Sequence, residues 1–248
     1  MRVEIGDLLA TGRVPADPAA LATALPDSPR WVETRWMLRE GAGWARTAGG
    51  GAGAVVVAEE LRLGAVVGHP DPAVLRGALD EAPPGFALIV QLSDLAHVRA
   101  ELTGWAAPAL ATIHRLSTRA PKDAPPDSGV VVLTPPDGEL VSRLPADMRR
   151  EAPYATAMAV RLAEGSPVSV CQATAVTETL WDAGVETAKG HRRRGYASAC
   201  FRTLAAYMAA AGKEPVWGAE EGNRGSMELA RKLGFEPAER VAIVRPPH

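Results

Sequence analysis

Three consecutive arginines stand directly before a glycine, at the start of an Ala-rich stretch with helical spacing. They are Arg192, Arg193 and Arg194, followed by Gly195. The first turn of a helix has unpaired backbone N–H groups and the positive end of the helix dipole, so it attracts phosphate. Gly195 has no side chain and Ala197 has a small one, so a ligand can approach the backbone. The segment predicts a phosphate or pyrophosphate site, although an isolated basic run can also be a solvated turn.

Carboxylates lie on the stretch that leads into these arginines. Residues 181–188 predict a strand, and side chains alternate along a strand, so Asp182, Gly184 and Glu186 share a face if the strand is regular. A β-bulge would change that arrangement. An amine must be neutral to attack a carbonyl, and a carboxylate can accept its proton directly or through water. Asp182 and Glu186 are therefore candidate catalytic residues and Glu178 is a third, with ordinary solvent-facing acids as the alternative.

Regular elements surround these residues from residue 129 onward. Periodicity and turn residues predict two kinds of element. Strands are expected at 130–134, 155–165, 167–176, 181–188, 214–219 and 240–245. Helices are expected at 137–151 with a break at Pro145, at 195–212 with Gly212 past its end, and at 223–234 with Asn223 as N-cap.

The first 118 residues also predict a mixed α/β region. A hairpin is expected at 54–67, a helix at 71–82, a strand at 86–92 and a helix at 93–102 with Ser93 as N-cap. The histidines His69, His97 and His114 are scattered, and no catalytic constellation is predicted here. The glycine run 48–53 precedes neither a helix nor a Lys-Ser/Thr pair, so a phosphate loop is not expected.

Residues 118–129, rich in Pro and Asp, predict a linker. We therefore expect two domains, an N-terminal α/β domain of unknown role over 1–120 and a second domain over 129–248.

The motif RRRGYA at 192–197 resembles the pyrophosphate loop of the GCN5-related N-acetyltransferases (GNAT). Upstream, the residues Val185-Glu186-Thr187 resemble the family's central strand. Downstream, NRGS at 223–226 and LGF at 233–235 resemble its last conserved segment, and all three pieces occur in the family's order. The resemblance is sharp over 181–235, softer over 130–180, and does not cover the first 120 residues.

The resemblance implies a mixed, mostly antiparallel sheet flanked by helices, and acetyl-CoA as co-substrate. It assigns the pyrophosphate to backbone amides of the loop, whose residues are Arg192, Arg193, Arg194, Gly195, Tyr196 and Ala197. The backbone at Val185 and Thr187 would hold the pantetheine and the acetyl carbonyl. Asn223 and Ser226 would meet the pantetheine arm or the nucleotide end. The similar strand–helix rhythm suggests that the N-terminal region is a diverged copy of the same fold.

The resemblance implies an N-acetyltransferase in which a primary amine attacks acetyl-CoA directly in a ternary complex. Many members carry a Tyr seven residues after the Asn as general acid, but this chain has Ala230 there. Tyr154 and Tyr207 are not placed at the site by any pattern, so the acid is unassigned. A non-catalytic regulatory protein that binds acyl-CoA is the alternative, and transfer of a longer acyl group is a third possibility.

Composition limits the other classes of function. The chain has 248 residues, 47% of them hydrophobic, and a net charge of −2, so it has a core but no global basic field for nucleic acid. Its two cysteines, Cys171 and Cys200, stand in apolar stretches without metal spacing and predict buried thiols and no metal site. With no signal peptide or apolar run of spanning length, we expect a cytoplasmic protein without a membrane partner. The acceptor can be a small molecule or a peptide, and the sequence leaves the oligomeric state open.

Overall fold

The computed structural model describes residues 17–48, 52–102, 104–117 and 129–246. The chain divides into two compact units, each built from several segments. The N-terminal unit comprises residues 1–113, 219–223 and 238–248, and the C-terminal unit comprises 114–218 and 224–237. Most of the expected linker lies outside the described residues, so the division between residues 120 and 129 stays a prediction.

The N-terminal unit is built on a mixed sheet with helices. Its strands are β1 (Trp44–Thr47), β2 (Gly53–Ala58), β3 (Leu63–Gly68) and β4 (Ala87–Gln91), and it shares β5 (Ala109–Leu116) and β11 (Phe235–Val244) with the other unit. Its helices are α2 (Pro18–Ala24), the 3₁₀ turn η1 (Pro29–Trp31), α3 (Val32–Arg39), α4 (Pro72–Asp80) and α5 (Leu95–Glu101). Strands β1, β2 and β3 pair antiparallel, β3 pairs parallel with β4, and β4 pairs antiparallel with β11.

These elements confirm the hairpin, the two helices and the strand predicted between residues 54 and 102. Alternate residues of β2, β3 and β4 form one buried core with helices α4 and α5, including Val55, Leu75 and Phe86. The N-cap prediction for α5 was wrong: Asp94 occupies that position, and the Ser93 hydroxyl donates a hydrogen bond to its Oδ1 at 2.9 Å. The Asp94 side chain makes no capping hydrogen bond to the helix.

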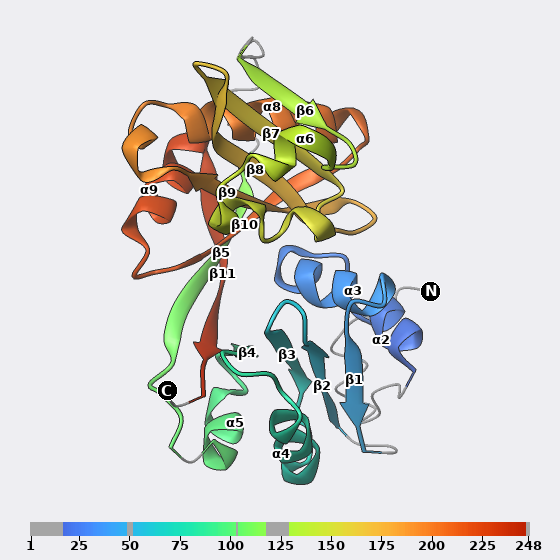
Figure 1. Cartoon of the computed structure of the whole chain (residues 1–248). Helices are drawn as coiled ribbons and strands as arrows, with labels where there is room; N and C mark the ends of the chain where they lie inside the picture. Colours follow the sequence, from blue (N-terminus) through green and yellow to red (C-terminus); the bar gives the residue numbers. More distant parts are fainter. Residues whose placement is uncertain (1–16, 49–51, 103, 118–128, 247–248) are drawn as a thin grey trace. The chain divides into compact units, whose positions relative to one another are not determined.

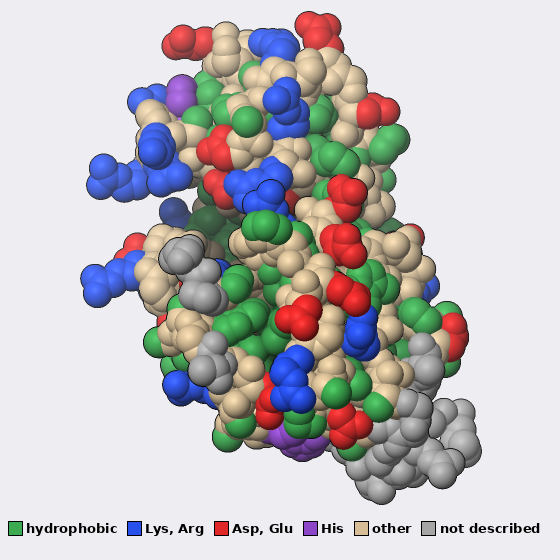
Figure 2. All heavy atoms as spheres, turned by 60° about the horizontal axis from the view of Figure 1, so that its bottom comes forward, with side chains coloured by type: hydrophobic (Ala, Val, Ile, Leu, Met, Phe, Trp, Pro, Cys, Tyr) green, Lys and Arg blue, Asp and Glu red, His purple; other side chains and the backbone are tan. Residues whose placement is uncertain are grey.

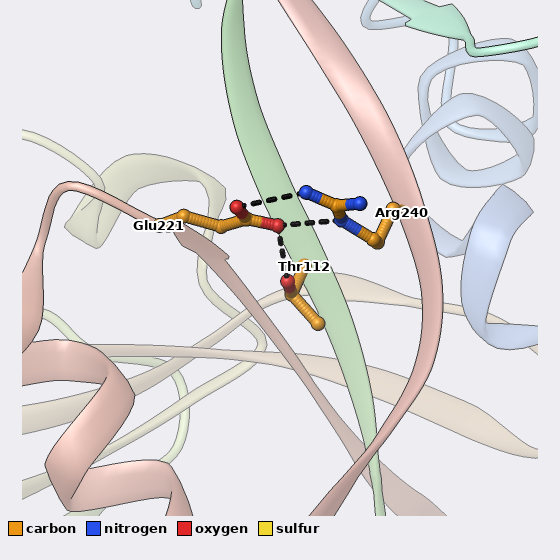
Figure 3. Close-up of polar contacts among 3 residues, drawn as sticks. All are labelled: Thr112, Glu221 and Arg240. Atoms are coloured by element: carbon orange, nitrogen blue, oxygen red, sulfur yellow. Dashed lines mark hydrogen bonds and ion pairs between the residues drawn. The ribbon is translucent and has the colours of Figure 1, made fainter.

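A carboxylate in the N-terminal unit joins three of its segments (Figure 3). Arg240 on β11 donates two hydrogen bonds to Glu221, from Nε at 2.7 Å and from a terminal nitrogen at 3.0 Å. The Thr112 hydroxyl on β5 donates a third at 3.1 Å, and the Glu221 backbone N–H bonds to the Leu110 carbonyl at 2.8 Å. The hydrogen bond from Arg240 lowers the pKa of Glu221. This bidentate pair holds β5 and β11 against the turn that follows β10 (Glu214–Glu220).

The C-terminal unit is a curled, mostly antiparallel sheet flanked by helices, with the strand order β5-β10-β9-β8-β7-β6. The remaining strands are β6 (Val130–Leu133), β7 (Ala157–Ala163), β8 (Ser166–Val176) and β9 (Leu180–Thr187). The helices are α6 (Gly138–Ser142), α7 (Ala146–Arg149), α8 (Tyr196–Ala210) and α9 (Arg224–Leu233), with 3₁₀ turns η2 (Ala152–Tyr154) and η3 (Lys189–His191). Strands β6 to β9 pair antiparallel, whereas β9 and β10 pair parallel.

Two sets of helices cover this sheet (Figure 1). The predicted helix 137–151 breaks as expected, because Pro145 takes an extended conformation between α6 and α7. Residues of α6 and α7, among them Val141 and Met148, pack on Met158, Val160 and Val170 of the sheet. Helix α8 packs against β6 to β9. Gly212 follows the end of α8 with φ +72°, as its position predicted.

Four aromatic rings form the core beneath α8. Phe201 on α8 lies 6.1 Å from Trp181 on β9, 5.8 Å from Trp217 on β10 and 5.3 Å from Phe235 on β11, measured between ring centroids. All four side chains are buried. Offset and edge-to-face contacts at these distances stabilise beyond the area that they bury. Phe201 therefore fixes α8 to the two strands that part beneath it.

The surface is mixed in charge. On the face drawn in Figure 2, acidic and basic side chains are interspersed, in line with the net charge of −2. Among the described residues, no helix is both long enough and apolar enough to cross a membrane.

We predict that Phe201→Ala lowers the free energy of unfolding by about 3–5 kcal/mol, because it leaves a cavity among three aromatic rings. Chemical denaturation measures the change. Tyr207→Ala on the same helix is the matched control, since that ring is 45% exposed and its loss should cost far less. Equal losses in the two variants would show that the aromatic cluster does not hold α8.

Candidate active site

Strands β9 and β10 pair over three residues and then part. Leu180, Trp181 and Asp182 pair with Glu214, Pro215 and Val216. From Ala183 to Thr187, the described residues of β9 pair with β8 but not with β10. One edge of β9 is therefore open over these residues.

The backbone groups on that open edge belong to alternate residues. The Ala188 N–H bonds to the Val168 carbonyl at 2.9 Å, and the Glu186 carbonyl accepts a hydrogen bond from the Ser169 hydroxyl at 3.0 Å, so even-numbered residues face β8. Backbone groups alternate in direction along a strand, so those of Val185 and Thr187 face the opposite side. These are the two residues whose backbone groups were expected to hold an extended ligand.

A register shift lies where the strands part. The pairing of β8 with β9 slips between Ala173 and Val176, opposite Asp182. Asp182 is half-buried at the last residue paired with β10, whereas Gly184 and Glu186 lie in the regular part of the strand. This register shift interrupts the regular alternation of side chains at Asp182, whereas Gly184 and Glu186 follow that alternation.

The segment after β9 forms a helix N-terminus open to solvent. Gly195 is the N-cap of α8 with φ +84°, and no side chain caps the helix. The first intrahelical bond runs from the Ala199 N–H to the Gly195 carbonyl at 3.0 Å. The N–H groups of Tyr196, Ala197 and Ser198 therefore have no acceptor within the helix. A Cβ built on Gly195 would meet nothing within 4 Å, so this end is unobstructed.

The three arginines are exposed around this N-terminus. Arg193 has φ +62°, a left-handed conformation that costs a non-glycine residue about 1–2 kcal/mol. Arg192 bends back and donates a hydrogen bond from Nε to the Thr187 carbonyl at 3.1 Å. Tyr196 is fixed between the Arg161 guanidinium, 5.1 Å from its ring centroid, and the His191 ring at 6.3 Å. The structure thus brings the loop residues together at the end of the open edge.

A carboxylate that sequence reasoning missed lies over the middle of β9. Glu151, between α7 and η2, places its Oε2 3.0 Å from the position that a Cβ on Gly184 would occupy. Burial raises the pKa of Glu151, and the charge of Glu186 raises it further, while Arg150 opposes both effects. Glycine at position 184 thus leaves the space in which the Glu151 carboxylate sits.

Glu186 follows Gly184 by two residues on β9. Although its side chain is exposed, partial desolvation raises its pKa; Asp147 acts in the same direction, and Arg192 and Arg150 act against it. A carboxylate with a raised pKa is better suited to accept a proton near neutral pH. No sequence motif marks Glu151. Its place over Gly184 depends on where the turn after α7 lies in the fold, and the sequence around neither residue indicates that.

The residues expected from the segment 223–226 lie at the start of α9. Asn223 directly precedes α9, and the Ser226 hydroxyl accepts a hydrogen bond from the Trp217 indole at 3.0 Å. Ser226 therefore has a structural partner in addition to its predicted role. Ala230, at the position where the resemblance leads one to expect a Tyr, is fully buried. Tyr154 is half-buried in η2 and Tyr207 is exposed on α8.

The three histidines contact other groups of the protein, and the two cysteines are buried. His114 is buried and contacts the Trp217 carbonyl at 3.1 Å, while His97 contacts the Pro70 carbonyl at 2.8 Å. His69 lies 3.4 Å from a carboxylate oxygen of Asp94. Cys171 and Cys200 are buried free thiols, as expected. Within the described ranges, no group of three or more His, Cys, Asp and Glu residues could hold a metal ion.

Comparisons with known proteins agree with this geometry. Residues 159–243 match the family model of the GNAT acetyltransferases. A search of curated protein sequences found no match.

Solved structures with the same fold cover most of the chain. A GCN5-related N-acetyltransferase-like protein from Streptococcus suis 89/1591 has a TM-score of 0.68 and 17% identity, covering 89% of this chain and 93% of its own. A putative GNAT-family acetyltransferase from Novosphingobium aromaticivorans DSM 12444 has a TM-score of 0.61 and 16% identity, with coverages of 90% and 98%. A tandem GNAT protein from the clavulanic acid biosynthesis pathway has a TM-score of 0.56 and 14% identity, with coverages of 97% and 94%. The last supports a two-domain arrangement.

We predict that Glu151→Gln stabilises the protein at pH 7 but not at pH 4. A carboxyl whose pKa is higher in the folded state than in the unfolded state costs stability once the pH exceeds the unfolded value near 4.5, and the cost is complete above the folded value. Below the unfolded value both states are protonated and the cost disappears. Thermal unfolding at the two pH values measures the difference.

Glu139→Gln on α6 is the matched control, because Glu139 is exposed and such surface changes alter the free energy of unfolding by about 0.5 kcal/mol or less. If Glu151→Gln destabilises the fold equally at both pH values, the carboxylate is held by favourable contacts instead.

Proposed function

We propose that the protein transfers an acetyl group from acetyl-CoA to a primary amine, on the premise that residues 159–243 match the family model of the GNAT acetyltransferases. The observation that carries the proposal is the open edge of β9 leading into the uncapped N-terminus of α8. A ligand with an amide-containing arm and a pyrophosphate would find backbone groups for the arm and a helix N-terminus for the phosphates. The N-terminal unit, on this proposal, is a diverged copy of the same fold.

Each part of acetyl-CoA has a complementary group. Backbone groups of Val185 and Thr187 would bond the pantetheine and the acetyl carbonyl. The free N–H groups at the start of α8, with Arg192, Arg193 and Arg194, would bind the pyrophosphate through charge-assisted hydrogen bonds of about 1.5–3 kcal/mol each. Asn223 and Ser226 would meet the pantetheine arm or the nucleotide end. The cytoplasm, where acetyl-CoA is abundant, is the expected location.

The reaction proceeds by direct attack in a ternary complex. The amine loses a proton to a carboxylate, for which Asp182 and Glu186 are the candidates from the sequence, and its nitrogen attacks the thioester carbonyl. The C–S bond then breaks and the thiolate leaves. With Ala230 buried where a Tyr would donate, the thiolate must take its proton from the amine nitrogen or from water. A thiol with a pKa near 8.5 leaves tolerably as thiolate near neutral pH.

The residue at position 230 supports a second candidate function. A buried Ala230 in place of an acid is compatible with a regulatory protein that binds acyl-CoA without turnover. Release of free thiol, followed with a chromogenic disulfide and a panel of primary amines, separates the two. Acetyl-CoA binding without thiol release in the presence of any amine tested would support the regulatory function, and absence of acetyl-CoA binding would refute both.

We predict that Gly195→Ala weakens acetyl-CoA binding at least tenfold, about 1.4 kcal/mol, because its Cβ enters the space over the α8 N-terminus. Calorimetry measures the affinity. Gly212→Ala is the matched control: it lies just past the opposite end of α8, its φ is also positive, and its Cβ also meets nothing within 4 Å. The two variants should lose similar stability while only the first loses affinity, and an unchanged affinity in Gly195→Ala would remove the pyrophosphate from this loop.

We also predict that kcat/KM rises with pH to a plateau. The attacking amine and its carboxylate partner set the acidic limb, whereas a tyrosine acid near pKa 10 would add an alkaline fall. Rates measured between pH 6 and about 10.5 test this. An alkaline fall that Tyr154→Phe or Tyr207→Phe abolishes would show that a tyrosine from another element supplies the proton.

A further inference from the structure

The first residue of α8 is in contact with side chains from two other elements. The Arg161 guanidinium, which β7 supplies, lies 5.1 Å from the centroid of the Tyr196 ring. The His191 ring of η3 stacks on Tyr196 at 6.3 Å, with 30° between the two planes. All three residues belong to the C-terminal unit. The backbone N–H of Tyr196 is the first of those left open at the helix N-terminus, so the ring that these contacts hold belongs to the residue that starts the helix.

The position of the Arg161 guanidinium depends on a glycine at the start of β6. A Cβ on Gly129 would lie 2.6 Å from the guanidinium carbon, which is far inside van der Waals contact. The Gly129 backbone is itself fixed, because its carbonyl accepts a hydrogen bond from the Leu162 N–H at 3.0 Å. Glycine at position 129 therefore leaves the space in which the guanidinium lies.

A break in the sheet also occurs at Arg161. The pairing of β7 with β8 shifts register between Arg161 and Leu162, while on its other side Arg161 pairs with Val130. An irregularity of this kind changes the direction in which a side chain leaves its strand. Arg161 is half-buried, so its side chain lies along the protein and does not extend into solvent.

The charge of Arg161 does not favour this position in the absence of a ligand. The N-terminus of a helix is the positive end of its dipole, which repels a cation, and three exposed arginines already surround the N-terminus of α8. The contact with the Tyr196 ring is attractive, because the face of an aromatic ring carries partial negative charge. We therefore look for the role of Arg161 in what it does to the ring.

The first turn of α8 needs such a contact. Gly195 at the N-cap has no side chain to cap the helix, and the turn before it includes Arg193 at positive φ. Uncapped helix ends fray, and a ligand that binds a frayed end must first order it. Tyr196 is the first residue of the helix whose side chain can be held by a neighbouring element.

We propose that Arg161 is a positioning residue for the coenzyme: through its cation–π contact with Tyr196 it keeps the first turn of α8 formed, so that the N–H groups there are aligned before the pyrophosphate binds. This inference rests on the proposed function. It gives a part in coenzyme binding to a residue on β7, outside the segment 181–235 that carries the sharp resemblance. Arg161 acts through the ring and makes no contact with the ligand itself.

Gly129→Ala tests the proposal without removing a charge. The new methyl group takes the place of the guanidinium, which moves away because it is the end of a flexible side chain. The dissociation constant for acetyl-CoA should rise about two- to fivefold, the loss of one cation–π contact. Since ground-state and transition-state binding weaken together, the KM for acetyl-CoA should rise while kcat stays the same.

The N-terminal unit offers a matched control for this variant. The Arg46 guanidinium lies 5.9 Å from the centroid of the Trp44 ring, and a Cβ on Gly77 would lie 2.6 Å from one of its terminal nitrogens. Gly77→Ala therefore displaces a similar guanidinium from a similar ring and should leave the affinity for acetyl-CoA unchanged. An equal rise in the dissociation constant in Gly77→Ala and Gly129→Ala would show that the effect is not specific to Tyr196.

A double-mutant cycle separates action through the ring from direct contact with the ligand. If Arg161 acts through Tyr196, then Arg161→Leu and Tyr196→Leu each raise the dissociation constant by a similar factor, and the double variant raises it no further. Tyr196→Phe keeps the ring and should bind like the wild type. If the two factors multiply in the double variant, Arg161 acts independently of the ring and the proposal is wrong.

Hydrogen exchange of the ligand-free full chain separates this inference from the proposed function. The first intrahelical bond of α8 runs from the Ala199 N–H to the Gly195 carbonyl. Its protection should fall about two- to fivefold in Arg161→Leu, while that of Leu204 in the middle of the helix stays the same. Arg46→Leu should change neither.

The outcomes are distinct. If the wild type binds no acetyl-CoA but Ala199 loses protection in Arg161→Leu, the proposed function fails and the role of Arg161 in ordering α8 stands. If acetyl-CoA binds and Arg161→Leu leaves the Ala199 protection unchanged, the positioning role is wrong. If protection falls and affinity does not, the contact is structural only, and the proposal is again overturned.

Discussion

The parting of β9 from β10 after Asp182 and Val216 is the constraint on which the rest of the site depends. A strand paired on both edges has no backbone groups to offer a ligand, whereas β9 pairs with β8 from Ala183 to Thr187 and is open on its other edge there. An open edge inside a domain is a liability, because unpaired N–H and C=O groups cost free energy when buried. The aromatic cluster around Phe201 stabilises the region where the strands separate, because it packs α8 against Trp181 on β9 and Trp217 on β10.

The same constraint explains where conformational strain is tolerated. Directly after the open edge, Arg193 and Gly195 both take positive φ in the turn that leads into α8. Gly195 does this at no steric cost, while Arg193 does it at a cost that an ordinary turn would avoid. Strain of this kind persists where the surrounding structure over-determines it. The Arg192 bond to the Thr187 carbonyl is one such restraint, because it ties the turn to the strand.

Local signals in the sequence were sufficient to predict the N-terminus of α8 and the strand β9 that precedes it. Gly195, Gly212 and the break at Pro145 have the conformations that their residue types predict. The composition of the two units could not be predicted, because residues 219–223 and 238–248 return to the N-terminal unit through pairing of β11 with β4 and the bonds of Glu221 to Arg240 and Thr112. Such contacts join residues far apart in the chain and leave no periodic trace. Ser93 failed as a cap for a smaller reason: the helix begins one residue later than its sequence pattern suggests, so Asp94 stands at the N-cap position.

Glu151 shows why a side chain that packs over a sheet is harder to predict than a phosphate-binding loop. A phosphate site made of backbone groups needs glycine and small residues at fixed spacing, and that spacing is visible in one segment. A carboxylate that packs over a sheet needs no fixed spacing in the sequence, and this one comes from the turn after α7 and reaches β9 because position 184 has no side chain. The informative residue is therefore the glycine. A glycine in a regular strand lowers strand stability, and it is retained where another group must approach the backbone. At Gly184 that group is an acid whose own burial disfavours its charge, so the fold carries two unfavourable terms at one point.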